Sequence, residues 1–190
     1  MAAPTPISAL VHSSTLVVVG VYLLFRYYSL LMGIDGLLFI LRKVGCCTLL
    51  MASLMACFEF DIKKLVALST LGHLGFMVYV LGLGYPMFRV FHLFRHALFK
   101  SLLFLCVGYY IHRVGFSLQD TRQLCGIGWV SSSVVVSCSV VGFGSLCGLP
   151  YLRGFYSKHV ILESSISTLR GRFELLCLVV GAVVRCFYSM

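Results

Sequence analysis

The stretch MFRVFHLFRHALFKSLLFLCVGYYI, residues 87–111, decides how the rest of the chain is interpreted. It is long enough for a helix that crosses a membrane, which needs about 20 predominantly apolar residues. Inside it stand His92, His96 and Lys100, although each ionisable group within a membrane costs several kcal/mol. Such a segment predicts a membrane protein whose interior carries functional polar side chains.

The composition points the same way for the whole chain. Of its 190 residues, 60% are hydrophobic and 11% are charged, and the mean hydropathy is +1.01; soluble domains carry about 25% charged residues. These values argue against a soluble globule. The net charge of +9 is scattered rather than clustered, which argues against nucleic-acid binding. The nine cysteines lack Cys-x-x-Cys spacing, so we expect buried small hydrophobes and no disulfides or zinc site.

The apolar runs predict an all-α, polytopic transmembrane helix bundle that forms a single domain over residues 1–190. Gly148 and Pro150 predict that one membrane element is a broken helix. Lys and Arg fall on both sides of successive spans, so the orientation stays open. The six expected elements cover residues 8–26, 37–58, 62–83, 87–112, 127–168 (broken) and 173–189.

The spacing of His92, His96 and Lys100 places all three within about 80° on one helix face, over about 12 Å of rise. Histidine and desolvated lysine both exchange protons, so the stripe is a possible proton relay. Two other interpretations stay open. In the first, the histidines bond to backbone carbonyls or neighbouring helices while Lys100 reaches an interface. In the second, the two histidines share a metal ion. A metal would need a third ligand, and the adjacent cations would repel it.

Two further groups of basic residues lie inside apolar runs. Arg42 and Lys43 reach an interface if their span begins near Val44. Lys158 follows the predicted break, where helix ends expose backbone dipoles to a polar cavity. The alternative is an interfacial lysine in a short loop.

Four ordered segments resemble one known family, subunit 5 of NADH dehydrogenase, the antiporter-like subunit of respiratory complex I. The large subunit of multisubunit Na⁺/H⁺ antiporters shares this fold. The segments are PTPISALVHSSTLVVVGVYLL (4–24), FEFDIKKLVALSTLGHLGFM (58–77), FHLFRHALFKSLLFL (91–105) and GLPYLRGFYSKHVILES (148–164).

The resemblance implies a hydrated axis for protons through the membrane, with an exit lysine after the broken helix. It implies structural or interfacial roles for Lys63 and Lys64, and it assigns no role to Glu163. The residues that match the proton relay are His12, His92, His96, Lys100 and Lys158.

The same resemblance implies a membrane-arm subunit of proton-translocating NADH:ubiquinone reductase, without redox catalysis on this chain. It implies no cofactor or metal here; FMN, iron–sulfur clusters and ubiquinone are expected elsewhere in the complex. The expected partners are the lipid bilayer, other membrane-arm subunits and especially a subunit 4-like neighbour, and the expected location is the mitochondrial inner membrane. The alternatives are a bacterial plasma membrane, a non-conducting structural subunit, or the large Na⁺/H⁺ antiporter subunit.

Three positions depart from the family pattern. His159 stands where an acidic residue usually follows the exit lysine, so a lysine–carboxylate pair cannot be assumed. Arg95 replaces a small polar residue, which adds a charge beside the relay, and His73 replaces a common glutamine.

The chain is also shorter than its family, whose members run to several hundred residues. We expect one fragment of a subunit encoded in pieces. Because no presequence is visible, the chain is either synthesised where it inserts or directed there by its own spans. Its own helices are expected to be too few to enclose His92 and Lys100. Another polypeptide would then supply upstream helices against residues 8–24, and a third would supply helices beyond Met190.

Overall fold

The computed structural model describes residues 7, 9–34, 36–115, 119–122, 126, 131–167 and 172–189. Within these ranges the chain is almost entirely helical, and its only β feature is an isolated bridge between Asp61 and Asp120. The predicted all-α class is therefore confirmed. The elements are η1 (Ala9–Thr15, a π-helix), α2 (Leu16–Arg26), α3 (Tyr28–Met32), α4 (Leu37–Phe58), α5 (Ile62–Gly82), α6 (Pro86–Val114), α7 (Ser133–Cys147), α8 (Arg153–Ser167) and α9 (Arg172–Ser189).

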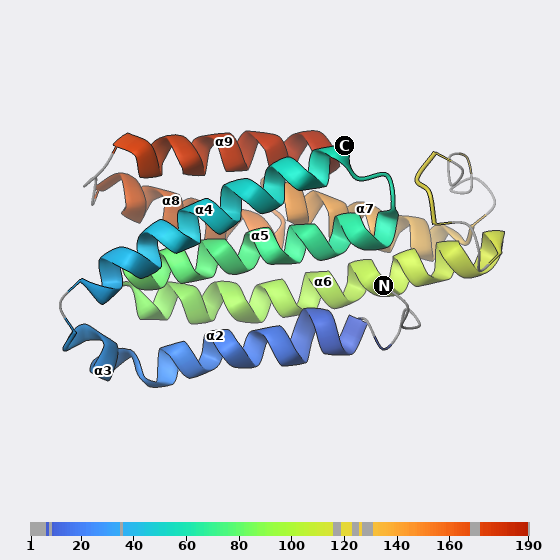
Figure 1. The fold of residues 1–190 in the computed structure, drawn as a ribbon. Helices are drawn as coiled ribbons and strands as arrows, with labels where there is room; N and C mark the ends of the chain where they lie inside the picture. The colour runs from blue at the N-terminus through green and yellow to red at the C-terminus, as the bar shows by residue number, and fades with distance from the viewer. Residues whose placement is uncertain are drawn as a thin grey trace.

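The long helices lie side by side in one bundle (Figure 1). Helix α5 lies between α4 and α6, α9 packs against the other side of α4, and α2 packs against α6. Helices α7 and α8 contact both α6 and α9. The short α3, which the apolar pattern did not predict, lies at one end of the bundle beside α4.

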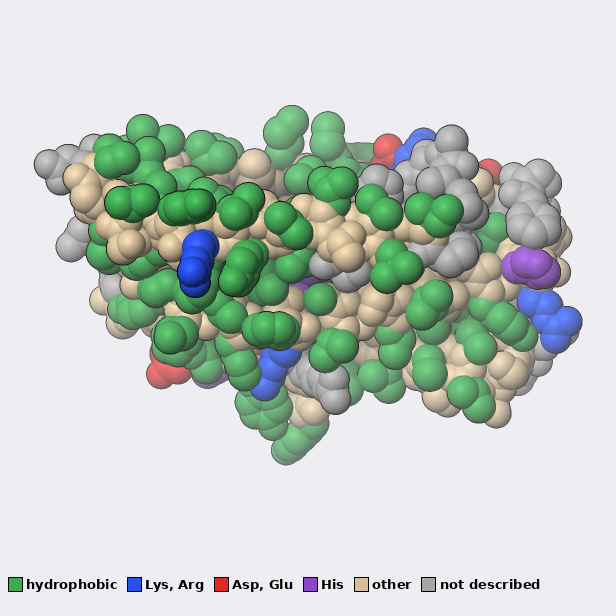
Figure 2. Space-filling view, turned by 90° about the horizontal axis from the view of Figure 1, so that it is seen from below, with side chains coloured by type: hydrophobic (Ala, Val, Ile, Leu, Met, Phe, Trp, Pro, Cys, Tyr) green, Lys and Arg blue, Asp and Glu red, His purple; other side chains and the backbone are tan. Residues whose placement is uncertain are grey.

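The outer surface of the bundle is apolar. Four helical stretches are long and apolar enough to cross a membrane: Ala9–Arg26, Leu37–Phe58, Ile62–Gly82 and Pro86–Val114. Large side chains such as Leu16, Phe94 and Leu105 point outward and are exposed. Figure 2 shows that the face on the α2 side is largely hydrophobic, with few charged side chains. Such a surface suits contact with lipid.

Glycines bring α4 and α5 together more closely than other residues allow. A Cβ atom on Gly45 would lie 2.5 Å from the Tyr79 nitrogen and 2.8 Å from the Gly75 oxygen, and one on Gly82 would lie 2.7 Å from the Arg42 nitrogen. Small residues at helix contacts permit this approach in membranes. The contact holds one face of α5 against α4, which leaves its other face for α6.

The predicted broken helix is present as α7 and α8. Helix α7 ends at Cys147, and Gly148 follows in the left-handed conformation with φ of 86°. Pro150 then prevents the helix from continuing, and α8 resumes at Arg153. The part of the predicted element at 127–130 lies outside the described residues.

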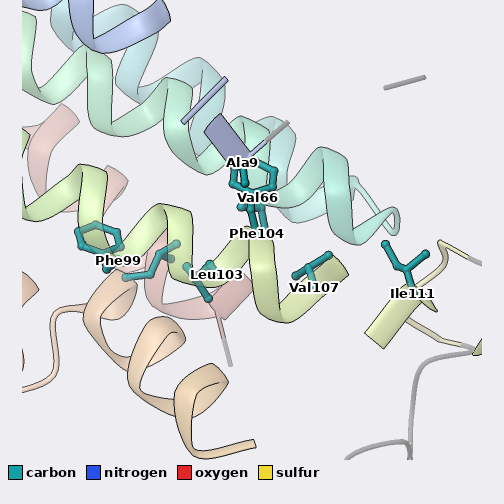
Figure 3. Packing of buried hydrophobic residues seen from close by; sticks show 8 residues of the cluster. Ala9, Val66, Phe99, Leu103, Phe104, Val107 and Ile111 are labelled. Carbon is teal, nitrogen blue, oxygen red and sulfur yellow. The ribbon is translucent and has the colours of Figure 1, made fainter. Parts of the chain in front are cut away.

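Apolar side chains pack in a cluster around the half of α6 that ends at Val114. Figure 3 shows Phe99, Leu103, Phe104 and Val107 in succession along α6, with Ala9 of η1 and Val66 of α5 close to Phe104. Leu146 of α7 belongs to the same cluster. These contacts set the rotation of α6, and with it the direction of the polar stripe on the same helix.

Candidate functional site

The polar stripe of α6 lies inside the bundle. His92 and Lys100 have an exposed fraction of 0%, and His96 has 1%. The expectation that these groups need another polypeptide to cover them is therefore wrong. Helix α5 is held in place by its glycine contact with α4, and α8 folds back against α6 after the break. Together these two helices of the same chain cover the stripe.

Lys100 is bound at the α5 side of the stripe. Its Nζ donates a hydrogen bond to the Ser69 hydroxyl, and it lies 3.4 Å from the Val66 carbonyl oxygen. The Ser69 hydroxyl itself donates to the same carbonyl over 2.7 Å. The interpretation that Lys100 reaches an interface is therefore wrong. None of the ion pairs in the described part of the chain involves Lys100.

His92 joins three helices. Its Nε2 lies 3.3 Å from Nδ1 of His73 on α5, and its Nδ1 lies 2.9 Å from Oγ of Ser157 on α8. In a neutral imidazole one nitrogen donates and the other accepts, so the tautomer decides the direction of both bonds. His92 can thus receive a proton on one ring nitrogen and release one from the other.

His96 differs from His92 because neither of its ring nitrogens has a hydrogen-bond partner. Its ring lies 5.1 Å from the His73 ring and packs edge-on to Phe99 at 5.4 Å. A buried polar group without a partner costs about 1–3 kcal/mol, and an internal water is the usual remedy. The alternative in which both histidines bond to neighbouring groups thus holds for His92 only.

Lys158 lies beside the helix break, where it is partly buried. Its Nζ donates to the carbonyl oxygen of Leu146, in the last turn of α7. A cation is favoured there because the last carbonyls of a helix lack intrahelical partners. Next to Lys158 is a cavity of about 260 Å³, which is also lined by Cys147, His159 and Arg185.

Two of the three residues that depart from the family pattern, His159 and Arg95, lie away from the buried stripe, whereas the third, His73, contacts it. His159 is exposed, and its Nδ1 lies 3.9 Å from the Glu163 carboxylate one turn further along α8. Glu163 thus contacts His159, whereas Lys158 donates to a backbone carbonyl, that of Leu146. The Arg95 guanidinium lies over the Phe91 ring at 3.9 Å and is only partly buried.

The remaining residues predicted from the sequence lie elsewhere. His12 belongs to η1, but its side chain lies outside the described part of the structure. Lys64 is exposed and pairs with Asp61 at 2.7 Å, which lowers the pKa of the Asp61 carboxyl. Lys63 is buried in the first turn of α5.

Arg42 was expected near the start of its span, and the structure shows where its side chain lies. Helix α4 begins at Leu37, so Arg42 lies within the helix, and its side chain is buried. Its Nε donates to the Glu174 carboxylate of α9 over 2.9 Å, and Lys43 contacts the same carboxylate at 3.2 Å. The long-range partner could not be read from the local pattern.

Several buried polar residues near the stripe were not among the site residues predicted from the sequence, although His73 stood out as a departure from the family pattern. Ser69 and His73 stand one turn apart on α5, a spacing that was visible in the sequence. Arg89 on α6 is fully buried, and none of its three guanidinium nitrogens has a partner. Arg185 on α9 is buried, donates to the Gly181 carbonyl over 3.1 Å, and lies with its guanidinium 5.5 Å from the Phe76 ring centre.

Metal binding finds no support in this geometry. Among the residues that the structure describes, no three His, Cys, Asp or Glu side chains come together in an arrangement that could hold a metal ion. His73 lies beside the His92–His96 pair, but the three side chains are not arranged as ligands of one ion.

An apolar helix bundle that buries lysine, arginine and histidine in its centre defines a polytopic membrane protein with an ionisable interior. A family model described as "NADH:quinone oxidoreductase/Mrp antiporter, TM" matches residues 1–184. This chain belongs to that family.

Curated relatives and solved structures agree with this assignment. The chain is 50% identical over 165 residues to "NADH-ubiquinone oxidoreductase chain 5" of Locusta migratoria, covering 86% of this chain and 28% of that one. It is 43% identical over 192 residues to the protein of the same description from Apis mellifera ligustica, covering 100% and 33%. The chain therefore spans only about a third of the length of these relatives.

Two solved structures share the fold. The Mrp complex from Dietzia sp. DQ12-45-1b matches with a TM-score of 0.80 and 31% identity, over 98% of this chain and 21% of that one. The membrane-bound sulfane sulfur reductase, an archaeal respiratory membrane complex, matches with a TM-score of 0.85 and 22% identity, over 98% and 39%. The second likeness concerns the fold alone.

Proposed function

We propose that this chain carries part of a proton-translocation path in the membrane arm of proton-pumping NADH:ubiquinone oxidoreductase. The observation that carries the proposal is the fully buried polar seam through Lys100, His96, His92 and Ser157, which connects α5, α6 and α8 inside an apolar bundle. Groups this costly to bury within a membrane mark ion or proton pathways. The relatives described as chain 5 of the oxidoreductase support the choice of complex.

In this proposal, protons move along the seam in steps between groups that exchange them. Lys100 passes a proton towards His96, His92 passes it to the α8 side, and Lys158 releases it into the adjacent cavity. His12 belongs to the same path as a further proposed member. Because the groups are cationic when protonated, a proton on one disfavours a proton on the next, so charge moves through the seam rather than accumulating there.

The energy comes from redox reactions in other subunits, which hold FMN, iron–sulfur clusters and ubiquinone. This chain supplies no redox group. We place it in the mitochondrial inner membrane as a multi-pass protein. Its neighbours there are the remaining helices of the subunit, on the same polypeptide or another, and a subunit 4-like protein of the membrane arm.

One observation favours a second candidate, a structural subunit that keeps the fold without conducting protons. Lys158 bonds to a backbone carbonyl, and the exposed His159 stands where the family usually has an acidic residue. A Na⁺/H⁺ antiporter subunit is the third candidate, because the Mrp complex shares 31% identity. The higher identity to the chain 5 relatives favours the respiratory complex.

The test replaces Lys100 with methionine, which fills a similar volume but cannot carry a proton. In the assembled complex reconstituted into vesicles, we expect Lys100→Met to lower the number of protons moved per NADH oxidised while assembly is kept. The matched control is Lys64→Met, because Lys64 is an exposed lysine of the neighbouring helix. Unchanged pumping in an assembled Lys100→Met complex would favour the structural candidate.

A further inference from the structure

His73 is the central residue of the buried histidine cluster, and none of the roles proposed above includes it. It stands on α5 with an exposed fraction of 0%. Its Nδ1 lies 3.3 Å from Nε2 of His92, whereas its Nε2 has no hydrogen-bond partner. One ring nitrogen of His73 is thus engaged and the other is free to receive a proton.

The geometry of the cluster puts His73 between the two histidines of α6. The ring centres of His92 and His96 are 6.4 Å apart, whereas those of His73 and His96 are 5.1 Å apart and those of His73 and His92 are 5.4 Å apart. The two α6 histidines are neighbours on one helix face, but in this structure each of their rings lies closer to His73 than to the other. The shorter route for a proton between His96 and His92 therefore runs through His73 on α5.

We propose that His73 carries protons between His96 and His92, and thereby closes a gap in the seam that α6 alone leaves open. This inference rests on the function proposed above. It adds a protonatable residue at a position where the family that the chain resembles commonly has glutamine. A glutamine amide makes hydrogen bonds but does not take up a proton near neutral pH.

The transfer uses both ring nitrogens of each histidine. Neutral His73 starts with its proton on Nδ1, and Nε2 accepts a second proton from His96, directly or through one water. The Nδ1 proton then passes to Nε2 of His92. The Nδ1 proton of His92 passes to Ser157 Oγ as that hydroxyl gives up its own proton to a water molecule on the α8 side. Each ring ends as the opposite neutral tautomer and must exchange tautomers before the next cycle. One proton has moved and no electron is involved.

An aromatic ring and the two α6 histidines lie against the His73 side chain. Phe99 stands edge-on to the ring at 5.7 Å. Among the described residues, only other members of the histidine cluster offer His96 a protonatable ring close by.

The experiment compares His73→Gln and His73→Phe with Lys100→Met in the assembled complex, reconstituted into vesicles. The readout is protons moved per NADH oxidised, with assembly and NADH oxidation measured in parallel. The glutamine amide keeps a hydrogen bond to His92, so a residue that only positions His92 would be replaced by glutamine without loss. We expect both His73 variants to lose as many protons per NADH as Lys100→Met.

The outcomes separate this inference from the function on which it rests. If Lys100→Met lowers the proton yield and His73→Gln keeps the wild-type yield, His73 is a positioning residue and the inference is overturned. If Lys100→Met itself pumps normally, the proposed function fails. Should His73→Phe not assemble, His73→Gln decides alone, because it preserves the polar contact and most of the volume.

Discussion

Nδ1 of His73 and Nε2 of His92 lie 3.3 Å apart, and this contact joins α5 to α6 in the interior of an apolar bundle. The contact matters because polar groups at membrane depth are tolerated where they face each other or a wet cavity. It places the functional seam between two helices that follow each other in the chain. Helix α8 then closes the seam from the other side through Ser157.

The first prediction concerns Ser157, the link from α6 to α8. Replacing it with alanine removes the oxygen that lies 2.9 Å from His92 Nδ1. We expect Ser157→Ala to lower the protons moved per NADH and Ser157→Thr, which keeps the hydroxyl, to restore them. Ser167→Ala is the control, because that exposed hydroxyl donates to the Ser164 carbonyl of the same helix. Equal proton yields in all three variants would remove Ser157 from the path.

The second prediction concerns the exit at the helix break. Lys158→Met removes the donor to the Leu146 carbonyl and the charge beside the cavity. We expect proton yield to fall while the complex still assembles, and we expect Lys158→Arg to retain part of it because the charge remains. Measurements in reconstituted vesicles decide this, and a Lys158→Met complex that pumps fully would show that protons leave by another route.

The third prediction concerns stability. Glu174 on α9 accepts from Arg42 and contacts Lys43 on α4, and both Glu174 and Arg42 are buried. Removing one partner of a buried pair costs about 3–5 kcal/mol, because the other charge stays buried. We therefore expect Glu174→Gln to lower the unfolding temperature of the detergent-solubilised complex.

The control for that measurement is Glu163→Gln. Glu163 is exposed on α8, and surface changes usually stay within about 0.5 kcal/mol. Similar unfolding temperatures for the two variants would mean that the α4–α9 ion pair does not stabilise the bundle.

The fourth prediction concerns the contact between α4 and α5. A Cβ atom on Gly75 would lie 2.8 Å from the backbone nitrogen of Leu49, so a larger side chain must push the helices apart. Overpacking costs about 1–3 kcal/mol and occasionally more. We expect Gly75→Val to reduce the amount of assembled complex on native gels. The control is Gly20→Val on α2, because a Cβ atom there meets nothing within 4 Å. If both variants reduce the amount of assembled complex equally, the close contact between α4 and α5 is not the cause.

The fifth prediction concerns water in the interior. Arg89 and His96 are buried with unpartnered nitrogens, and buried polar groups are normally satisfied by protein or ordered water. We expect a high-resolution cryo-electron microscopy map of the native complex to show ordered water at both side chains. Dry, unpartnered nitrogens in such a map would contradict a hydrated seam.

The sequence alone determined much of the architecture. Apolar runs of membrane-spanning length predicted the helical bundle, and Gly148 with Pro150 predicted the break between α7 and α8. It also placed His92, His96 and Lys100 on one face of one helix, because the helical repeat is a local property of the backbone. These features depend on residues close together in the chain.

Tertiary structure decided what surrounds that face. The enclosure of Lys100 by Ser69, the approach of His73 to His92 and the pairing of Arg42 with Glu174 join residues 19 to 132 positions apart. The local pattern could not show them, and it led to the mistaken expectation that another polypeptide must cover the stripe. Each contact depends on how neighbouring helices rotate and how closely they approach. Those two quantities are set by packing between distant segments, such as the glycine contact of α4 with α5, and not by the periodicity of any one segment.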